Sequence, residues 1–388
     1  MRLMGTTTAA RRVVRKSQCA IFEERKPTAN YHMLKSFTAH NFRCFKSVEL
    51  PDLRRINLVV GKNAAGKTAL LEAIRFGLAG TPQVLWQMNA ARGAINYFPQ
   101  PPTREQFEAF WNSHFYNFDP TNPILSECVD SSGRKATLKV YYDPKKAVTP
   151  LPPQPGQPAA SLVSTIIPLA FDRTDFSGKH SVLHGSVHPQ GALNLENGPE
   201  LGTVSEFYSS TWQNNPQQTA QWFSQLSVQK REPEVIREVV KEFGSLVKDL
   251  TVLSPTPYSA VYADVPHLKE KIPLSLISSG INKFVTILAA ILTRGQGVLL
   301  IDEIENGIYY EAFPSLWKTI LRLAKTYQTQ IFASTHSLEC IRGLLPSTKD
   351  NEEEIMLLRA ERQNGSSGIT PITGEFFEAA LEQNFEVR

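Results

Sequence analysis

An eight-residue glycine motif constrains this chain more than any other stretch of it. Residues 61–68 read Gly-Lys-Asn-Ala-Ala-Gly-Lys-Thr, the pattern G-x-x-x-x-G-K-T. The apolar run at 56–60 predicts a buried strand before it, and residues 69–74 predict a helix after it. In this context the glycines turn backbone N–H groups toward a β-phosphate, and the helix N-terminus adds its positive dipole end. An ordinary glycine turn is the weaker interpretation.

The residues of this motif have separate expected roles. Lys67 would reach the β- and γ-phosphates, and the Thr68 hydroxyl would bind Mg²⁺. The rest of the loop would surround the phosphates; it consists of Gly61, Lys62, Asn63, Ala64, Ala65 and Gly66. The sequence therefore predicts ATP and Mg²⁺ as the ligands of this chain.

A second apolar strand, at residues 297–301, ends in two acidic residues, Asp302 and Glu303. Asp302 would hold Mg²⁺ together with Thr68, and Glu303 would polarise the attacking water as general base. Glu305 is a weaker candidate for that role. A buried strand with a solvated acidic end is the alternative, and the glycine motif upstream disfavours it.

A third strand, around residues 330–334, ends in Ser-Thr-His-Ser. One predicted helix, at 313–327, separates it from the acidic pair, and a crossover of that length places two parallel strands side by side. His336 would then hydrogen-bond the γ-phosphate or the attacking water. A structural histidine is the alternative.

Two serines and a glycine, Ser278, Ser279 and Gly280, precede a strongly apolar helix at 284–292. A helix start of this kind can bind an anion through its free N–H groups. It can equally be a serine N-cap with no ligand, and taken alone the motif favours that interpretation.

Composition and cysteine usage argue against a membrane-spanning, a secreted or a disulfide-stabilised protein. The hydrophobic fraction of 41% and the charged fraction of 20% are ordinary for a globular chain. No apolar run approaches the roughly 20 residues that a membrane span needs, and no secretory signal is visible. The four cysteines lack C-x-x-C spacing, which indicates free thiols in a reducing compartment. We therefore expect a cytoplasmic protein without a membrane partner.

The positive charge is concentrated at the N-terminus. Residues 1–32 hold seven basic and two acidic residues, a net charge of +5. Because the whole chain has a net charge of +4, residues 33–388 carry a net charge of −1. The folded part therefore gives weak evidence for nucleic-acid binding. We expect 1–32 to be a disordered basic tail or to precede a true start at Met33; a nucleic-acid arm and a transit peptide stay open.

The rest of the chain predicts a mixture of strands and helices. Strands are expected at 35–42, 46–50 and 136–142, and a proline-rich loop at 150–158. An aromatic-rich helix is expected at 104–114, and an amphipathic helix at 234–250 within a mainly helical stretch at 200–250. The aromatic residues at 107–118 are expected in the core. The stretch at 200–250 is a candidate helical lobe inserted into the ATPase core.

The order of these motifs resembles the ABC-type ATPase heads of the RecF/SMC/OLD class. Residues 34–45 are similar to their first strand pair, 301–307 (Ile-Asp-Glu-Ile-Glu-Asn-Gly) resemble AAA-type, OLD-like members, and 379–388 resemble their ending. The resemblance implies an α/β P-loop NTPase fold, an ABC-type head with a mixed central sheet flanked by helices and an inserted helical lobe. The implied divisions are a tail at 1–32 and an ATPase domain at 33–388, with an N-terminal lobe at 33–145, a proline-rich insertion and helical lobe at 146–270, and a C-terminal lobe at 271–388.

The same resemblance assigns roles to the later motifs. Ser278, Ser279 and Gly280 would be the signature motif, which contacts ATP bound to a second subunit, so that ATP controls a homodimer. His336 would be the switch histidine. Two departures stand out: Tyr309 replaces a frequent histidine, and the signature lacks the usual second glycine and glutamine. Gln87 is a candidate Q-loop residue by proximity alone.

These features predict an ATP-hydrolysing switch that acts on DNA or on a separate effector protein, in bacterial anti-phage defence or DNA repair. The alternative is a non-hydrolysing, ATP-dependent scaffold for an effector. A P-loop kinase with Arg92 and Arg104 as lid arginines is a third reading, which leaves the serine and histidine motifs without a role. OLD-type relatives often carry a C-terminal Toprim nuclease, but the 52 residues after His336 are too few for such a domain of roughly 100 residues.

Overall fold

The computed structural model describes residues 32–93, 102–150, 165–202, 205–209, 216–255, 257–349, 351–363 and 365–373. The expected tail up to residue 31, the proline-rich loop beyond residue 150 and the family-like ending at 379–388 lie outside the described residues.

A mixed sheet of six strands carries the glycine motif. Its order is β16-β15-β3-β14-β13-β9, in which every neighbouring pair is parallel except β15 with β16. The strands are β3 (Ile56–Val60), β9 (Ser205–Tyr208), β13 (Val298–Ile301), β14 (Gln330–Ser334), β15 (Ile355–Gln363) and β16 (Ser366–Thr373). β14 therefore separates the glycine-motif strand β3 from the acidic strand β13. The expected parallel pairing of β13 with β14 is confirmed.

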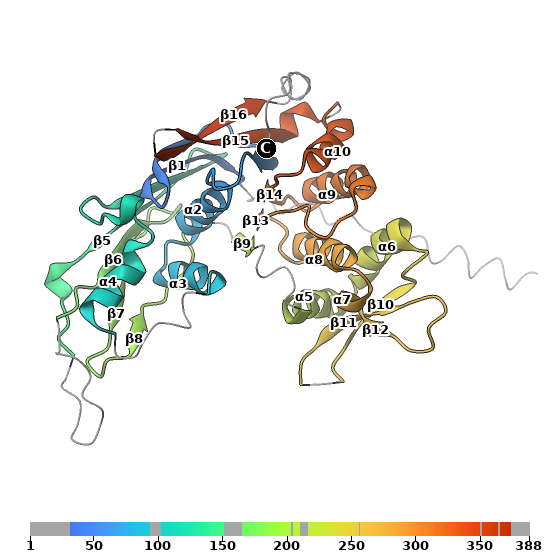
Figure 1. The fold of residues 1–388 in the computed structure, drawn as a ribbon, viewed down its shortest axis with the longest axis horizontal. Helices are drawn as coiled ribbons and strands as arrows, with labels where there is room; N and C mark the ends of the chain where they lie inside the picture. Colours follow the sequence, from blue (N-terminus) through green and yellow to red (C-terminus); the bar gives the residue numbers. More distant parts are fainter. Residues whose placement is uncertain are drawn as a thin grey trace, which may run out of the picture. The chain divides into compact units, whose positions relative to one another are not determined.

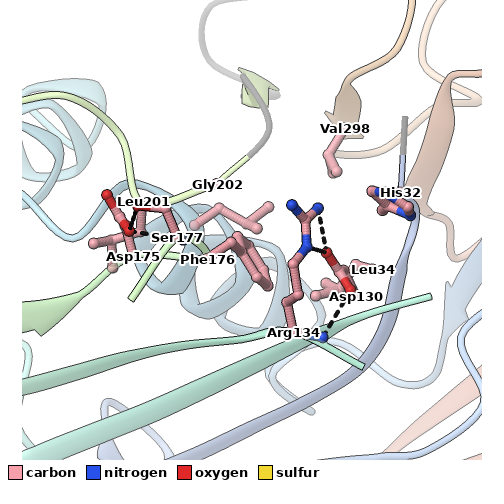
Figure 2. Close-up of a pocket in the computed structure, with 11 residues that line it drawn as sticks. His32, Leu34, Asp130, Arg134, Asp175, Phe176, Ser177, Leu201, Gly202 and Val298 are labelled. Atoms are coloured by element: carbon pink, nitrogen blue, oxygen red, sulfur yellow. Dashed lines mark hydrogen bonds and ion pairs between the residues drawn. The ribbon is translucent and has the colours of Figure 1, made fainter. Parts of the chain in front are cut away.

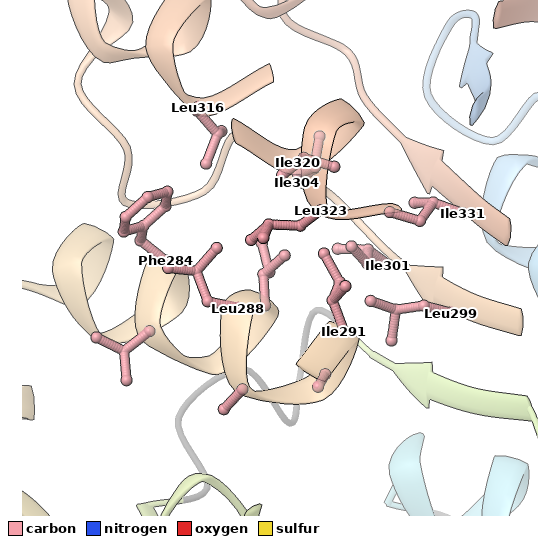
Figure 3. Packing of buried hydrophobic residues seen from close by; sticks show 14 of the residues in the cluster. Phe284, Leu288, Ile291, Leu299, Ile301, Ile304, Leu316, Ile320, Leu323 and Ile331 are labelled. Carbon is pink, nitrogen blue, oxygen red and sulfur yellow. The ribbon is translucent and has the colours of Figure 1, made fainter. Parts of the chain in front are cut away.

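Both faces of this sheet are buried, which explains why its parallel strands are apolar almost throughout. In β13, Leu299 and Ile301 join one core, and Val298 and Leu300 join the other. The first core also contains α8 (Ser279–Thr293), α9 (Phe313–Thr326) and α10 (Leu338–Thr348); the second contains α2 (Lys67–Ala79). The two sets of helices lie on opposite sides of the strands (Figure 1). Figure 3 shows Ile291 of α8 beside Leu299 and Ile301 of β13, and Phe284 near Leu316 of α9.

An antiparallel sheet of seven strands covers the outer side of α2. Its order is β2-β1-β4-β5-β6-β7-β8. The strands are β1 (Leu34–Phe42), β2 (Phe45–Leu50), β4 (Ile124–Asp130), β5 (Lys135–Tyr142), β6 (Leu169–Thr174), β7 (His180–Val187) and β8 (Leu193–Leu195). Helices α3 (Pro82–Ala91) and α4 (Arg104–Asn112) accompany it. The aromatic residues of α4 are in the core, as predicted, whereas Phe118 is 70% exposed.

The predicted helical stretch at 200–250 is partly wrong. The structure has α5 (Pro216–Val228) and α6 (Glu232–Phe243), but the amphipathic helix does not continue to residue 250. Leu250 is instead buried in the strand β10 (Asp249–Leu253). An apolar residue at this position fits the spacing of a helix as well as that of a strand, so the pattern alone does not distinguish them. β10 forms a small antiparallel sheet with β11 (Ala260–Asp264) and β12 (Ile272–Pro273), before α7 (Leu274–Ile277).

The interval 146–270 is therefore less helical than predicted, since β6 to β8 belong to the large antiparallel sheet and β9 to the parallel one. Short 3₁₀ turns lie at Tyr116–Phe118, Pro144–Lys146, Tyr310–Ala312 and Glu352–Glu354. The predicted α/β fold, with a mixed central sheet flanked by helices, is confirmed. In the part of the chain that the structure describes, no helix has the length and apolarity of a membrane span.

Candidate functional site

The glycine motif forms a tight loop between β3 and α2. Gly61 and Gly66 have φ values of +138° and +106°, a region that residues with a Cβ rarely adopt. A Cβ at Gly61 would lie 2.2 Å from the Ala360 carbonyl oxygen, so β15 leaves no room for a side chain there. The first turn of α2 contains no acidic residue, and its positive dipole end therefore stays available to an anion.

Lys67 lies across this loop. Its Nζ donates hydrogen bonds to the carbonyl oxygens of Gly61 (2.7 Å) and Lys62 (3.0 Å). Burial lowers the pKa of Lys67, and the nearby carboxylates oppose that shift, Glu305 most strongly and then Asp302. The ammonium thus lies between the phosphate loop and the acidic residues that follow β13.

Asp302 joins the glycine motif to the later strands. The Thr68 hydroxyl donates to its carboxylate, at 3.1 Å from each oxygen, although 234 positions separate the two residues. Ser334 Oγ, from the end of β14, donates to Asp302 Oδ1 at 2.6 Å. The structure therefore brings together the segments that the sequence predicts to share one ligand.

This donor set fits Mg²⁺. A hydroxyl and a carboxylate are hard oxygen donors, and Mg²⁺ is usually held by one or two carboxylates together with water and substrate phosphates. Across the described ranges, no group of three or more His, Cys, Asp or Glu side chains could hold a metal alone. Thr68 and Asp302 are the residues that would hold the ion.

Glu303 is held at its backbone and its side chain. Its N–H donates to Ser334 Oγ (2.8 Å), its carbonyl accepts from Lys283 Nζ, and Asn306 Nδ2 donates to its carboxylate (2.5 Å). Its φ of +49° is left-handed, which is unusual for a residue other than glycine. Ser334 and Lys283 thus fix the Glu303 backbone, and Asn306 orients the carboxylate that would act as general base.

His336 is paired with Glu305. Its Nδ1 lies 2.9 Å from Glu305 Oε1, and the same oxygen accepts the His336 backbone N–H at 2.9 Å. The His336 side chain is 46% exposed, whereas that of Glu305 is 8% exposed. The imidazole therefore lies at the surface beside the acidic cluster, oriented by a buried carboxylate.

The predicted signature motif, residues 278–280, contacts the loop that follows the acidic pair. The Ser278 side chain caps α8 by accepting the Ile281 N–H (3.4 Å), as the N-cap interpretation predicts. A Cβ on Gly280 would lie 2.2 Å from the Gly307 carbonyl oxygen, so α8 begins in direct contact with the loop after the acidic pair. Within the described residues, the hydrogen bonds of the signature motif do not reach the glycine motif.

The other candidates from the sequence are engaged elsewhere. Gln87 is exposed on α3. Arg92 forms a two-bond ion pair with Glu72 of α2 (3.0 Å for each bond), and Arg104 pairs with Glu108 at 2.6 Å. The two arginines considered as kinase lid residues therefore hold carboxylates of this chain.

Sequence reasoning missed three residues that shape the site: Ser334, Asn306 and Lys283. Ser334 and Asn306 lie inside segments already singled out, but nothing in their spacing indicated a partner. Lys283 had a signal, because a lysine in the apolar run of α8 must satisfy its charge.

Two cavities lie apart from the glycine motif and the acidic pair. One, of about 190 Å³, is mainly apolar and includes Ser278, Gly280 and Tyr309 in its lining. The other, of about 270 Å³, lies between the start of β13 and the hairpin turns of the antiparallel sheet, where Arg134 pairs with Asp130 (Figure 2). Neither lining includes a residue of the glycine motif, Asp302 or Glu303.

Comparison with known proteins gives two family matches. A model described as "AAA domain, putative AbiEii toxin, Type IV TA system" matches residues 200–342, and one described as "AAA domain" matches residues 36–87. The second contains the glycine motif, and the first contains the signature, the acidic pair and His336. Both matching models describe AAA domains, and between them they contain the motifs from which the sequence predicts an ATPase.

A relative from Helicobacter pylori, named ATP/GTP phosphatase, is 21% identical over 341 residues, which cover 80% of this chain and 87% of the relative. Solved structures of similar chains include an SMC head bound to the C-terminal winged-helix domain of ScpA, with 12% identity, coverage of 90% and 99%, and a TM-score of 0.47. The SMC head domain from Thermotoga maritima has 12% identity, coverage of 87% and 98%, and a TM-score of 0.42.

Proposed function

We propose that this chain is an ATP-hydrolysing switch in which Glu303 activates the attacking water. The observation that carries the proposal is the convergence of Lys67, Thr68, Asp302 and Glu303 at the ends of β3 and β13, bridged by Ser334 of β14. Lys67 would bind the β- and γ-phosphates, and Glu303 would accept a proton from water. The name of the Helicobacter pylori relative supports phosphate release from ATP.

Magnesium has a defined place in this proposal. Thr68 and Asp302 would bind the ion, whose charge offsets that of the β- and γ-phosphates. His336, oriented by Glu305, would contact the γ-phosphate or the attacking water. The loop Gly61–Gly66 would surround the phosphates with backbone N–H groups.

We propose further that two copies of the chain assemble around ATP. The signature motif packs against the loop at Gly307 and leaves Ser279 exposed, which supports a role toward ATP held by a second copy. Each site would then combine the glycine motif, Asp302 and Glu303 of one copy with the signature motif of the other. The three described cysteines, Cys44, Cys128 and Cys340, are free thiols, which supports the cytoplasmic placement.

In this proposal the switch acts on DNA or on a separate effector protein. The match to a family described as a putative AbiEii toxin favours a role in bacterial defence over one in DNA repair. A scaffold that binds ATP without hydrolysing it is the alternative function, and the fixed position of Glu303 disfavours it.

The substitution Glu303→Gln tests this function. The amide cannot accept the proton, so we expect phosphate release to fall by about 10² to 10⁴-fold while ATP binding is retained. Size-exclusion chromatography with light scattering should show the E303Q protein as a dimer with ATP and Mg²⁺ and as a monomer without them. Hydrolysis by E303Q at the wild-type rate would show that Glu303 is not the base.

A further inference from the structure

Lys283 is a buried charge whose position the nucleotide site alone does not explain. It lies in α8, three residues after the signature glycine, and its side chain is 2% exposed within a helix whose residues 280–292 are all buried. A buried ammonium is costly unless it is paired, and burial lowers the pKa of Lys283 to about 8 against the opposing effect of Glu305. The helix thus keeps a lysine at a position where an apolar residue would be more stable.

The partner of this lysine is the backbone of the proposed general base. Lys283 Nζ donates to the Glu303 carbonyl oxygen, while Ser334 Oγ accepts the Glu303 N–H at 2.8 Å. Side chains from two elements therefore fix both polar backbone groups of Glu303. Because a left-handed φ of +49° is unfavourable for glutamate, the surrounding contacts must maintain it.

The same helix begins at the signature motif. Gly280 lies so close to Gly307 that a Cβ on Gly280 would approach the Gly307 carbonyl oxygen to 2.2 Å, and a Cβ on Gly307 would lie 2.6 Å from Ser279 Oγ. The first turn of α8 and the loop after Glu303 are therefore in direct contact at Gly280 and Gly307. A displacement of the signature turn would be transmitted to Glu303 through Lys283.

We propose that Lys283 is a positioning residue, which holds the Glu303 backbone so that its carboxylate meets the attacking water and which links that geometry to the signature turn. This inference rests on the proposed function, in which Glu303 is the base. Lys283 touches neither ATP nor water in this role; it acts through Glu303.

The test is a comparison of Lys283→Met with Lys283→Arg. Methionine fills a similar volume without a donor, so we expect kcat for ATP hydrolysis to fall roughly tenfold to hundredfold, with KM for ATP within about twofold of wild type. Arginine keeps the charge and the donors, and K283R should restore most of the rate. The matched control is Lys318→Met, the same substitution at an exposed lysine of α9, which should leave kcat unchanged.

A double-mutant comparison separates positioning from a general loss of structure. If Lys283 acts through Glu303, adding K283M to E303Q should not lower the residual rate further, whereas independent effects would multiply. Should K283M fail to fold by circular dichroism, K283Q replaces it, because its shorter side chain does not reach the Glu303 oxygen. A folded variant with the wild-type kcat, or multiplicative losses in the double mutant, would overturn the inference. An active E303Q protein would instead overturn the proposed base.

Discussion

At the scale of single residues, the Ser334 hydroxyl links the two acidic residues of the site. Its hydroxyl donates to Asp302 Oδ1 at 2.6 Å and accepts the Glu303 N–H at 2.8 Å. One small side chain on β14 therefore orients both the residue that would hold Mg²⁺ and the residue that would activate water. Groups that orient metal-binding carboxylates commonly matter nearly as much as the ligands themselves.

The substitution Ser334→Ala should therefore slow ATP hydrolysis and weaken Mg²⁺ binding without abolishing either. We expect kcat to fall about 10- to 100-fold and the Mg²⁺ concentration for half-maximal rate to rise, since Asp302 loses a donor that fixes it. The measurement is phosphate release across a Mg²⁺ titration, with the exposed Ser275→Ala as control. An unchanged Mg²⁺ dependence in S334A would contradict the role given to this hydroxyl.

At the scale of elements, the antiparallel sheet contains the same hairpin turn twice. Asp130-Ser-Ser-Gly-Arg joins β4 to β5, and Asp175-Phe-Ser-Gly-Lys joins β6 to β7. In each, the aspartate Oδ1 accepts the N–H of the serine two residues later, at 2.9 Å and 2.8 Å, and the glycine has a φ of +83°. The turns differ in two respects: the Asp130 side chain is only 4% exposed, and it forms an ion pair with Arg134 at 2.7 Å.

This difference predicts a pH-dependent contribution from Asp130. Burial alone would raise the pKa of Asp130, but hydrogen bonds from Ser132 and Arg134 outweigh it and lower the pKa. The ionised form therefore stabilises the fold at neutral pH, and this stability is lost as the pH falls through the lowered pKa. We expect Asp130→Asn to lower the free energy of unfolding by about 1 to 3 kcal/mol at pH 7, and by less below about pH 4.

Urea unfolding of the D130N protein and the wild type at several pH values is the measurement. Asp175→Asn is the matched control, because it changes the same turn without the buried ion pair and should cost less at pH 7. Equal losses in both variants, or a D130N deficit that stays constant with pH, would show that burial and the arginine pair do not distinguish the two turns.

The elements also show where sequence patterns are informative. The strand, loop and helix at 56–79 are predictable because each has a distinct local signal: an apolar run, glycines and a helical apolar period. The end of α6 was not predictable from spacing. Val247 and Leu250 continue the helical apolar spacing after Gly244, but both are buried outside the helix, Val247 between α6 and β10 and Leu250 in β10. Tertiary burial determines the outcome there.

At the scale of the whole molecule, strand order explains how much of the site the sequence could predict. Residues at the carboxyl ends of neighbouring parallel strands meet, so three strand-end motifs are enough to predict that Thr68, Asp302 and His336 gather at one edge. The pairing of His336 with Glu305 and of Lys283 with Glu303 depends on loop conformations, including the left-handed Glu303, that no local pattern encodes.

The division of the site between two copies gives the last prediction. Lys67→Ala should prevent ATP binding, and Ser279→Arg should place a bulky cation at the exposed start of α8 and block its contact with the ATP of a partner. Each protein alone should hydrolyse ATP at least about 10²-fold more slowly than wild type. A mixture of the two can form a heterodimer in which the glycine motif of the S279R chain faces the intact signature of the K67A chain.

That heterodimer contains one complete site, so mixing should restore hydrolysis to a substantial fraction of the wild-type rate, measured by phosphate release at a fixed total protein concentration. The restored rate should rise with protein concentration, because it depends on association. A mixture of K67A with E303Q is the informative control: its heterodimer has either no bound ATP or no base in each site and should remain inactive. Absence of recovery in the first mixture, with both proteins folded and S279R still binding ATP, would mean that each copy completes its own site.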